Sequence, residues 1–255
     1  MSPNLVALFT IARREVARIL RIWGQTLVPP AITMTLYFLI FGNLIGSRIG
    51  TMDGISYMDF IVPGLVMMAI IQNAYGNISS SFFGAKFGRH VEELLVSPMP
   101  NWVILGGYVA GGVLRGLMVG AIVLAIAMLF TKVRIPHPLV TLSTVVLGAV
   151  IFSLAGFVNA VYAKKFDDIA IVPTFILTPL TYLGGVFYSV KLLPGWAEAA
   201  THANPIFYMV NAFRYGLLGT SDVPLWVAYA LMIGFVVVLT ALALWLLKRG
   251  VGLRS

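Results

Sequence analysis

The chain has 255 residues, of which 60% are hydrophobic and only 10% are charged. A soluble domain carries about 25% charged residues, so the composition excludes a cytosolic enzyme, a disordered protein and a secreted disulfide scaffold, and it indicates a polytopic membrane protein. The chain has no cysteine and a net charge of +8, a basic excess that is typical of loops facing anionic lipid and not of a nucleic-acid-binding surface.

Residues 3–21 are predicted to form an amphipathic helix that lies in the membrane surface. At 100° per residue, its apolar side chains fall within an arc about 120° wide, and three arginines lie opposite. The apolar side chains are Leu5, Leu8, Phe9, Ala12, Val16, Ile19 and Leu20, and the arginines are Arg14, Arg18 and Arg21. This pattern is typical of a helix among lipid headgroups, although the arginines alone would also serve as a topogenic signal.

Long, largely uncharged stretches predict six membrane-spanning helices, because a helix needs about 20 apolar residues to cross the hydrocarbon. The six stretches are residues 22–47, 60–85, 94–131, 135–163, 169–190 and 223–247. Pro29 and Pro30 are expected to kink the first helix or delay its start. Residues 199–213 are uncharged but too short to cross, so we expect them to form a re-entrant or interfacial segment.

An even number of spans places both termini on one side, and the distribution of basic residues predicts that this side is the cytoplasm. With that orientation, the cytoplasmic basic residues are Arg13, Arg14, Arg18, Arg21, Lys86, Arg89, Lys164, Lys165, Lys248, Arg249 and Arg254, and the external ones are Arg48, Lys132, Arg134, Lys191 and Arg214. A cleavable signal peptide is not expected, because the first apolar run follows a charged helix and lacks a small-residue cleavage site.

The most charged internal segment, residues 86–97, follows the second predicted span and is expected on the cytoplasmic side. It contains Lys86, Arg89, Glu92 and Glu93, and Pro98 ends it. A short helix of mixed charge at the membrane face suits the docking of a soluble partner protein.

The sequence carries no recognisable site for ATP, for a metal ion or for acid–base catalysis. All nine acidic residues lie outside the cores of the predicted spans, whereas proton-coupled carriers place ionisable groups inside them. The chain has no His-Glu-x-x-His motif, and none of its lysines follows a glycine as a P-loop requires. Energy for uphill transport would therefore come from another polypeptide.

Two polar features do lie within the predicted spans. Asn73, Asn77 and Ser80 share one face of the second span, where they would either line a translocation path or form interhelical hydrogen bonds of about 0.6 kcal/mol each. Arg115 lies inside the third stretch, where a charge at the bilayer centre costs at least about 2.5 kcal/mol. We expect Arg115 to reach the inner headgroups, polar partners on other helices or a wet cavity. The same stretch has glycines at four-residue spacing, which predicts close helix packing; they are Gly107, Gly111, Gly112, Gly116 and Gly120.

Several segments together resemble the ABC-2 type permease family, the six-span membrane subunits of bacterial ATP-binding-cassette exporters. The segments are RIWGQTLVPP at residues 21–30, FIVPGL at 60–65, SFFGAKF at 81–87, EELLVSP at 92–98 and LTPLTYLGGVFY at 177–188, followed by Leu193-Pro194, Asn204-Pro205 and Arg214. They extend over nearly the whole chain.

The resemblance implies a single all-α transmembrane domain of the type V, ABCG-like fold, covering residues 1–255. Residues 3–21 would be its connecting helix, residues 86–97 the coupling helix, and residues 186–221 a set of re-entrant external helices, with a cytoplasmic tail at 248–255. In the coupling helix, Lys86, Arg89, Glu92 and Glu93 would contact the ATPase.

The implied function is that of an exporter subunit in the bacterial inner membrane, with both termini cytoplasmic. Two copies would pair, and two separate ATPase subunits would bind ATP and magnesium, so that this chain would hold no cofactor and catalyse no reaction. The path residues would be Asn73, Asn77 and Ser80, and the external gate would comprise Phe187, Tyr188, Asn204 and Pro205. The substrate would be a drug, a lipid or a lipid-linked saccharide.

Two alternative functions follow from the residues themselves. A secondary carrier or channel would act without an ATPase, and the lack of carboxylates inside the spans argues against proton coupling but not against facilitated diffusion. An intramembrane enzyme would need a catalytic grouping that the sequence does not contain.

Overall fold

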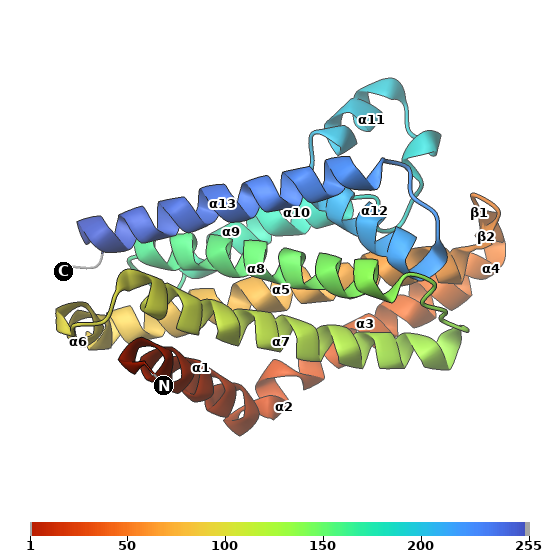
Figure 1. Cartoon of the computed structure of the whole chain (residues 1–255). Helices are drawn as coiled ribbons and strands as arrows, with labels where there is room; N and C mark the ends of the chain where they lie inside the picture. Colours follow the sequence, from red (N-terminus) through yellow and green to blue (C-terminus); the bar gives the residue numbers. More distant parts are fainter. Residues whose placement is uncertain (1, 253–255) are drawn as a thin grey trace.

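The computed structural model describes residues 2–252, and helices running roughly lengthwise make up most of it (Figure 1). The longest helices are α1 (Pro3–Arg21), α5 (Tyr57–Phe87), α7 (Asn101–Phe130), α8 (Pro138–Tyr162) and α13 (Leu225–Arg249). The shorter α-helices are α2 (Trp23–Thr26), α3 (Val28–Tyr37), α4 (Gly46–Ile49), α6 (His90–Val96), α9 (Asp168–Val172), α10 (Thr178–Tyr182), α11 (Gly195–His202) and α12 (Pro205–Leu218). Two π-helical segments (Phe38–Ile45 and Pro173–Leu177) and one 3-10 turn (Val190–Leu192) lie among them.

Within the described residues, a two-stranded hairpin is the one departure from the predicted all-helical fold. Strands β1 (Thr51–Met52) and β2 (Ile55–Ser56) pair antiparallel, with Met52 opposite Ile55. The turn between them holds Asp53 and Gly54 at positive φ, which is the geometry that a tight hairpin turn requires.

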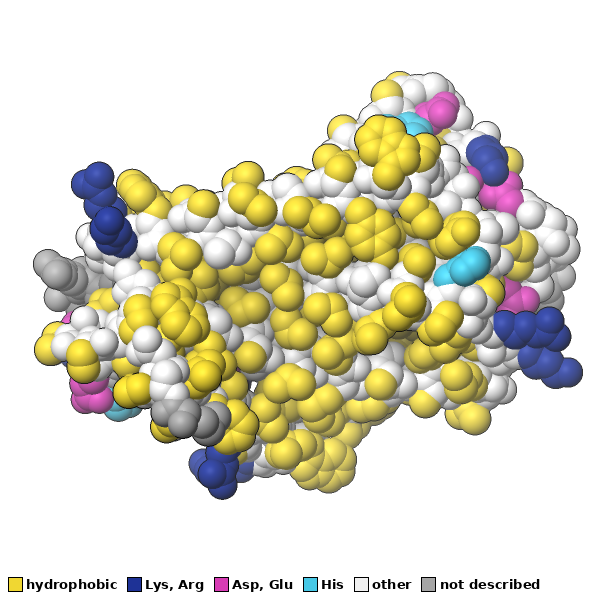
Figure 2. Space-filling model, in the orientation of Figure 1, with side chains coloured by type: hydrophobic (Ala, Val, Ile, Leu, Met, Phe, Trp, Pro, Cys, Tyr) yellow, Lys and Arg dark blue, Asp and Glu magenta, His cyan; other side chains and the backbone are white. Residues whose placement is uncertain are grey.

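The bundle has two distinct ends. The α6 end carries α6 and the C-terminal end of α13, and the α11 end carries α11 and the hairpin (Figure 1). Figure 2 shows that hydrophobic side chains cover the middle of the visible face, while most charged side chains gather at the two ends and beside α1. An apolar band between charged ends is the surface expected of a protein that crosses a bilayer.

Five helices within residues 2–252 are long and apolar enough to cross a membrane: Trp23–Ile49, Tyr57–Phe87, Asn101–Phe130, Pro138–Tyr162 and Leu225–Arg249. The first begins in two short pieces that meet at Leu27, and Pro29 and Pro30 lie in the first turn of the second piece, α3. The helix is thus interrupted just before the prolines, and its start at Trp23 is not delayed. The predicted stretch 94–131 is divided instead, because Pro98 and Pro100 separate α6 from α7.

The predicted span at residues 169–190 is shorter than expected. Its helix covers Asp168–Tyr182, in three segments of five residues each, which amounts to about 22 Å against about 30 Å of hydrocarbon. The helix ends at Tyr182 because Gly184 and Gly185 follow, and Gly185 adopts a φ of 71°. Val190, the predicted end of the span, lies in the separate 3-10 turn.

Helix α5 forms the centre of the bundle. Its most apolar 18-residue window is 83% buried, whereas the corresponding window of α13 is 22% buried. At the α11 end, α5 and the chain after α10 approach so closely that a Cβ at Gly64 would lie 2.8 Å from the Val186 backbone. A residue with a side chain could not occupy this position without moving one of the two segments.

Helix α1 packs on α7 through glycines, as the four-residue spacing predicts. A Cβ at Gly107 would lie 2.6 Å from Ile11, and one at Gly111 would lie 2.5 Å from Glu15. The buried face of α1 therefore differs from the predicted apolar arc. It comprises Ile11, Glu15 and Ile19, while Leu5, Phe9 and Leu20 are about half exposed, as befits side chains that face lipid.

The predicted tail at 248–255 lies only partly within the structure. Lys248 and Arg249 form the last turn of α13, and Gly250 ends the helix in the left-handed conformation. Residues 253–255, including Arg254, lie outside the described residues.

Candidate functional site

The predicted coupling segment forms a short helix at the α6 end. Helix α5 ends at Phe87, Arg89 turns the chain with a φ of 61°, and α6 follows. Val91 of α6 is buried, while Arg89, Glu92 and Glu93 are exposed. Three of the four predicted coupling residues thus share an accessible surface.

Lys86 is placed differently from those three residues. It belongs to the last turn of α5, and its Nζ donates to the carbonyl oxygens of Val161 and Ala163, each at 2.7 Å. These carbonyls lie at the end of α8 and just beyond it, where orphan acceptors need donors. The Lys86 side chain therefore fastens α5 to α8 within the chain.

A buried polar network joins α1 to α5. The Arg18 guanidinium donates to Glu15 Oε2 at 3.0 Å and to Asn77 Oδ1 at 2.7 Å. The Ser81 hydroxyl donates to Glu15 Oε1 at 2.7 Å. Glu15 and Asn77 are 1% and 0% exposed, so Asn77 forms an interhelical hydrogen bond, which is the second of the two interpretations open from the sequence.

Asn73, one turn before Asn77 on α5, binds a second arginine, Arg115 of α7. Arg115 Nη2 donates to Asn73 Oδ1 at 3.2 Å and to the Thr26 carbonyl oxygen at 3.5 Å. Arg115 thus meets polar partners on other helices, one of the three outcomes expected from the sequence. Ser80, by contrast, bonds only within α5, to the Gly76 and Asn77 carbonyls.

Phe187, a predicted gate residue, lies in an aromatic cluster at the α11 end. Its ring centroid lies 4.7 Å from that of Phe41, 5.5 Å from that of Tyr182 and 5.9 Å from that of Tyr37. The Tyr37 and Tyr182 hydroxyls share a hydrogen bond of 2.6 Å. The cluster therefore joins α3, the π-helical segment after it and the chain around α10.

The other predicted gate residues shape the chain beside this cluster. Asn204 caps α12 by accepting from the Ile206 amide at 3.0 Å, and its Nδ2 donates to the Leu180 carbonyl at 2.6 Å. Pro205 occupies the first position of α12, where it removes no helical hydrogen bond. Tyr188 is partly buried. Asn204 thus ties the start of α12 to α10.

Arg214 is a further buried charge at the α11 end. It is 3% exposed, and its Nη2 donates to the Gly185 carbonyl at 2.7 Å. Its guanidinium carbon lies 4.1 Å from the centre of the Phe60 ring, and its Nη1 lies 3.9 Å from an Asp222 oxygen. Arg214 therefore connects α12, α5 and the loop after α10.

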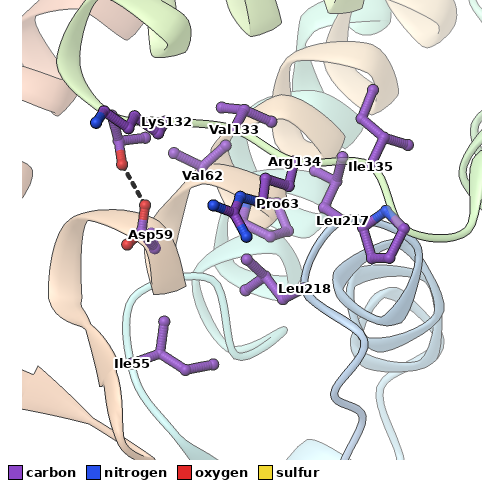
Figure 3. Close-up of a pocket in the computed structure, with 12 residues that line it drawn as sticks. Ile55, Asp59, Val62, Pro63, Lys132, Val133, Arg134, Ile135, Leu217 and Leu218 are labelled. Carbon is purple, nitrogen blue, oxygen red and sulfur yellow. Dashed lines mark hydrogen bonds between the residues drawn. The ribbon is translucent and has the colours of Figure 1, made fainter.

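A pocket of about 510 Å³ opens at the same end, between the start of α5, the end of α12 and residues 131–136. In Figure 3, the Arg134 guanidinium lies in the middle of this pocket, and the Thr131 hydroxyl donates to Asp59 at its edge. None of the residues predicted as sites from the sequence lines it.

Sequence reasoning missed Glu15 and Ser81 as members of the buried network. Glu15 is the one acid among four arginines in residues 1–21, and that contrast was the available signal. Nothing in the sequence singled out Ser81, because its hydroxyl meets the Glu15 carboxylate only where α1 approaches α5 in the fold.

The sites lie within a region that matches a known family. The family model described as ABC-2 type transporter matches residues 6–218, from the first turn of α1 to the last residue of α12. The chain belongs to the ABC-2 type transporter family. This confirms the resemblance that the sequence motifs indicated, and it makes the chain a membrane transport permease.

The chain is also similar to individual known proteins. The inner membrane transport permease YadH of Escherichia coli strain K12 is 59% identical over 250 residues, covering 98% of each chain. Nodulation protein J of Sinorhizobium fredii strain NBRC 101917 / NGR234 is 25% identical over 185 residues, covering 72% of this chain and 70% of its own. Nodulation protein J of Rhizobium meliloti strain 1021 is 22% identical over 186 residues, covering 72% and 71%. The ABC-2 permease similarity thus extends over the bundle and not over one motif alone.

Proposed function

We propose that this permease is one half of the membrane channel of an ATP-driven exporter. Two copies pair, and two separate ATPase subunits dock at the α6 end, which is cytoplasmic. ATP binding on those subunits switches the paired permeases from inward to outward access. The cargo is a hydrophobic or amphipathic molecule such as a drug, a lipid or a lipid-linked saccharide.

The observation that carries this proposal is the path of α5. This 31-residue helix, about 46 Å long, leads directly into the exposed coupling segment at one end. At its other end, the Tyr57 hydroxyl donates to the Phe187 carbonyl at 3.0 Å, and Gly64 lies against Val186. A push on α6 would therefore move the aromatic cluster through a single buried helix.

The proposed docking surface is charged, and hydrogen bonds fix its base to the bundle. Arg89, Glu92 and Glu93 are exposed beside Phe87 and Val96, which are 66% and 88% exposed. Lys86 fixes the base of the segment to α8, so a force applied to α6 would reach the bundle. Lys86 contributes to coupling through this anchor.

Six crossings give both termini a cytoplasmic location, with α9–α10 as the fifth. Asp168 accepts from the Lys164 and Lys165 amides near the α6 end, and Leu180 meets Asn204 near the α11 end. The short helix α9–α10 spans the bilayer because the segment around α11 and α12 enters the membrane and contacts the end of α10. Non-helical backbone is tolerated at that depth when it is buried in protein.

A second copy would pack on α3 and α9–α10. Helix α9 buries none of its side chains, and Phe175 and Ile176 are 73% and 51% exposed. Pairing through this face would bring the two Phe187 clusters together as an external gate. Among the predicted path residues, Asn73 also lines a cavity, whereas Asn77 and Ser80 serve packing.

The test uses the permease co-expressed with candidate ABC ATPase subunits and reconstituted into lipid nanodiscs. The double variant Glu92→Lys/Glu93→Lys reverses the charge of α6 and is expected to lower cargo-stimulated ATPase activity at least about tenfold, because opposite-charge contacts become repulsive. Glu198→Lys on exposed α11 is the matched control and should leave the activity unchanged.

The milder pair Glu92→Gln/Glu93→Gln separates lost docking from a weakened α6, since it removes charge without adding a cation to the first turn. Unchanged stimulation in both double variants would overturn the docking assignment. Concentrative transport by the permease alone in sealed vesicles would overturn the exporter proposal and favour a carrier.

A further inference from the structure

An open cavity of about 300 Å³ lies at the side of the bundle, where α1 leads into the first membrane helix. It lies between α2, α3, α5 and α7. The hydrogen-bonding side chains that line it are Gln25, Thr33, Gln72, Asn73 and Arg115. Asn73 and Arg115 lie near the middles of α5 and α7. These polar side chains therefore lie at a level of the bundle where most side chains are apolar.

The charge of Arg115 is not neutralised by any carboxylate within the described residues. Its two hydrogen-bond partners are the neutral oxygens of Asn73 and Thr26, and its Nε has no acceptor among the residues from 2 to 252. Arg18, which binds Asn77 one turn further along α5, is in contrast paired with Glu15 at 3.0 Å. A guanidinium carries five N–H donors and accepts none, so the cavity presents spare donors and a net positive charge.

Anions with planar or tetrahedral oxygen groups match this lining. Carboxylates and phosphates take two parallel hydrogen bonds from a guanidinium, and the carboxamides of Gln25 and Gln72 add further donors. A charge left alone in the hydrocarbon is costly, which makes an anionic occupant favourable at Arg115.

The surroundings of the cavity suit an anion that carries an apolar tail. At 100° per residue, Ile32 and Leu36 project within about 60° of Pro29, which lines the cavity. Ile32 and Leu36 are 57% and 51% exposed. Apolar side chains that face lipid thus border the cavity on α3.

We propose that this cavity binds the acidic headgroup, phosphate or carboxylate, of a membrane amphiphile. Arg115 is the charge partner, and Asn73 orients its guanidinium. The apolar tail lies along α3, beside Ile32 and Leu36. This binding does not rest on the exporter function, because it needs neither an ATPase nor a second copy.

Calorimetric titration of the purified full chain in neutral detergent tests the proposal. Dioctanoyl phosphatidylglycerol is expected to bind, and dioctanoyl phosphatidylcholine and inorganic phosphate at least about tenfold more weakly. Arg115→Gln is expected to weaken the phosphatidylglycerol affinity at least about tenfold, the loss of one charged hydrogen-bond partner. Arg13→Gln, an exposed arginine of α1, is the matched control and keeps wild-type affinity.

A second variant tests the site with the arginine retained. Asn73→Asp places a carboxylate where Asn73 Oδ1 now lies 3.2 Å from Arg115. It neutralises the guanidinium in place, gives up the hydrogen bond from Nδ2 to the Ala69 carbonyl within α5, and is expected to abolish selective binding of phosphatidylglycerol. This result would stand even if Arg115→Gln failed to fold.

Three outcomes would overturn the proposal. One is wild-type affinity in the Asn73→Asp variant. Another is phosphatidylcholine binding as tightly as phosphatidylglycerol, which would remove the role of charge. The third is inorganic phosphate binding as tightly as the lipid, which would assign the cavity to a free anion. Loss of coupled ATPase activity in the α6 variants leaves all three measurements unaffected.

Discussion

Arg115 and Arg214 are both arginines on helices of an apolar bundle, yet their surroundings differ. Arg214 is 3% exposed and has a carbonyl partner at 2.7 Å, an aromatic ring beneath its guanidinium and a carboxylate at 3.9 Å. Arg115 has two neutral oxygens at 3.2 and 3.5 Å and faces a cavity. The first charge has a carboxylate close by, whereas the second has none within the described residues and so has capacity left for an anionic ligand.

The position of each arginine along the bundle explains the difference. Arg214 lies at the α11 end, where Asp222 is close. Arg115 lies mid-helix, and the nearest carboxylate network, around Glu15, is already engaged by Arg18 and Ser81. An arginine is therefore structural where acids and carbonyls surround it, and it is a candidate binding group where they do not.

The largest effect expected from this comparison is on Arg214. Arg214→Gln should lower the free energy of unfolding by about 3 kcal/mol, because it removes a charged hydrogen bond and a desolvated cation–π contact. Arg115→Gln should change it by less than about 1 kcal/mol. Thermal unfolding in detergent measures both, with exposed Arg48→Gln as the control. Equal losses at the two arginines would contradict the distinction drawn here.

A smaller effect is expected at the packing of α1 on α7. Gly111→Leu should cost about 2 kcal/mol, since a Cβ there would already lie 2.5 Å from Glu15. The displaced α1 would carry Arg18 away from Asn77 and leave the Arg214 contacts intact. Gly76→Ala on α5 has open space around its Cβ, and it should be neutral or slightly stabilising. Equal melting temperatures for the two variants would refute the close approach.

The smallest effect is expected at Lys191, which shares Asp222 with Arg214. The Asp222 carboxylate, 3.0 Å from Nζ, raises the pKa of Lys191 above 10.5. A raised pKa means that the ion pair stabilises the fold fully below pH 10.5 and that this stabilisation is lost as the pH rises further. Because Lys191 is 65% exposed, Lys191→Met should cost only about 0.5 kcal/mol.

Unfolding curves of wild type and Lys191→Met at pH 8 and at pH 11 measure this contribution. The two proteins should differ at pH 8, and the difference should be smaller at pH 11. A difference that grew with pH would mean that Lys191 stabilises the fold through its packing and not through its charge.

Five of the six stretches predicted from the sequence correspond to helices long and apolar enough to cross a membrane, because hydropathy and length alone set that requirement. The sequence also indicated the short charged helix after α5, the interruption of the first span near Pro29 and Pro30, and the close packing of α7, since charge, proline and glycine spacing act locally. The motifs were sufficient to indicate the ABC-2 family, which the match over residues 6–218 confirms.

Only the tertiary structure decided the partners of the polar groups. Asn73 and Asn77 look alike in the sequence, one turn apart on the same face of α5. In the fold, Arg18 of α1 binds Asn77, whereas Asn73 binds Arg115 of α7, which has no carboxylate partner within the described residues. Lys86, Arg89 and Glu92 form one charged segment in the sequence, but the end of α8 takes up the lysine. Long-range packing assigns each polar atom its partner, and a pattern read along one helix holds no information about the helix that lies across it.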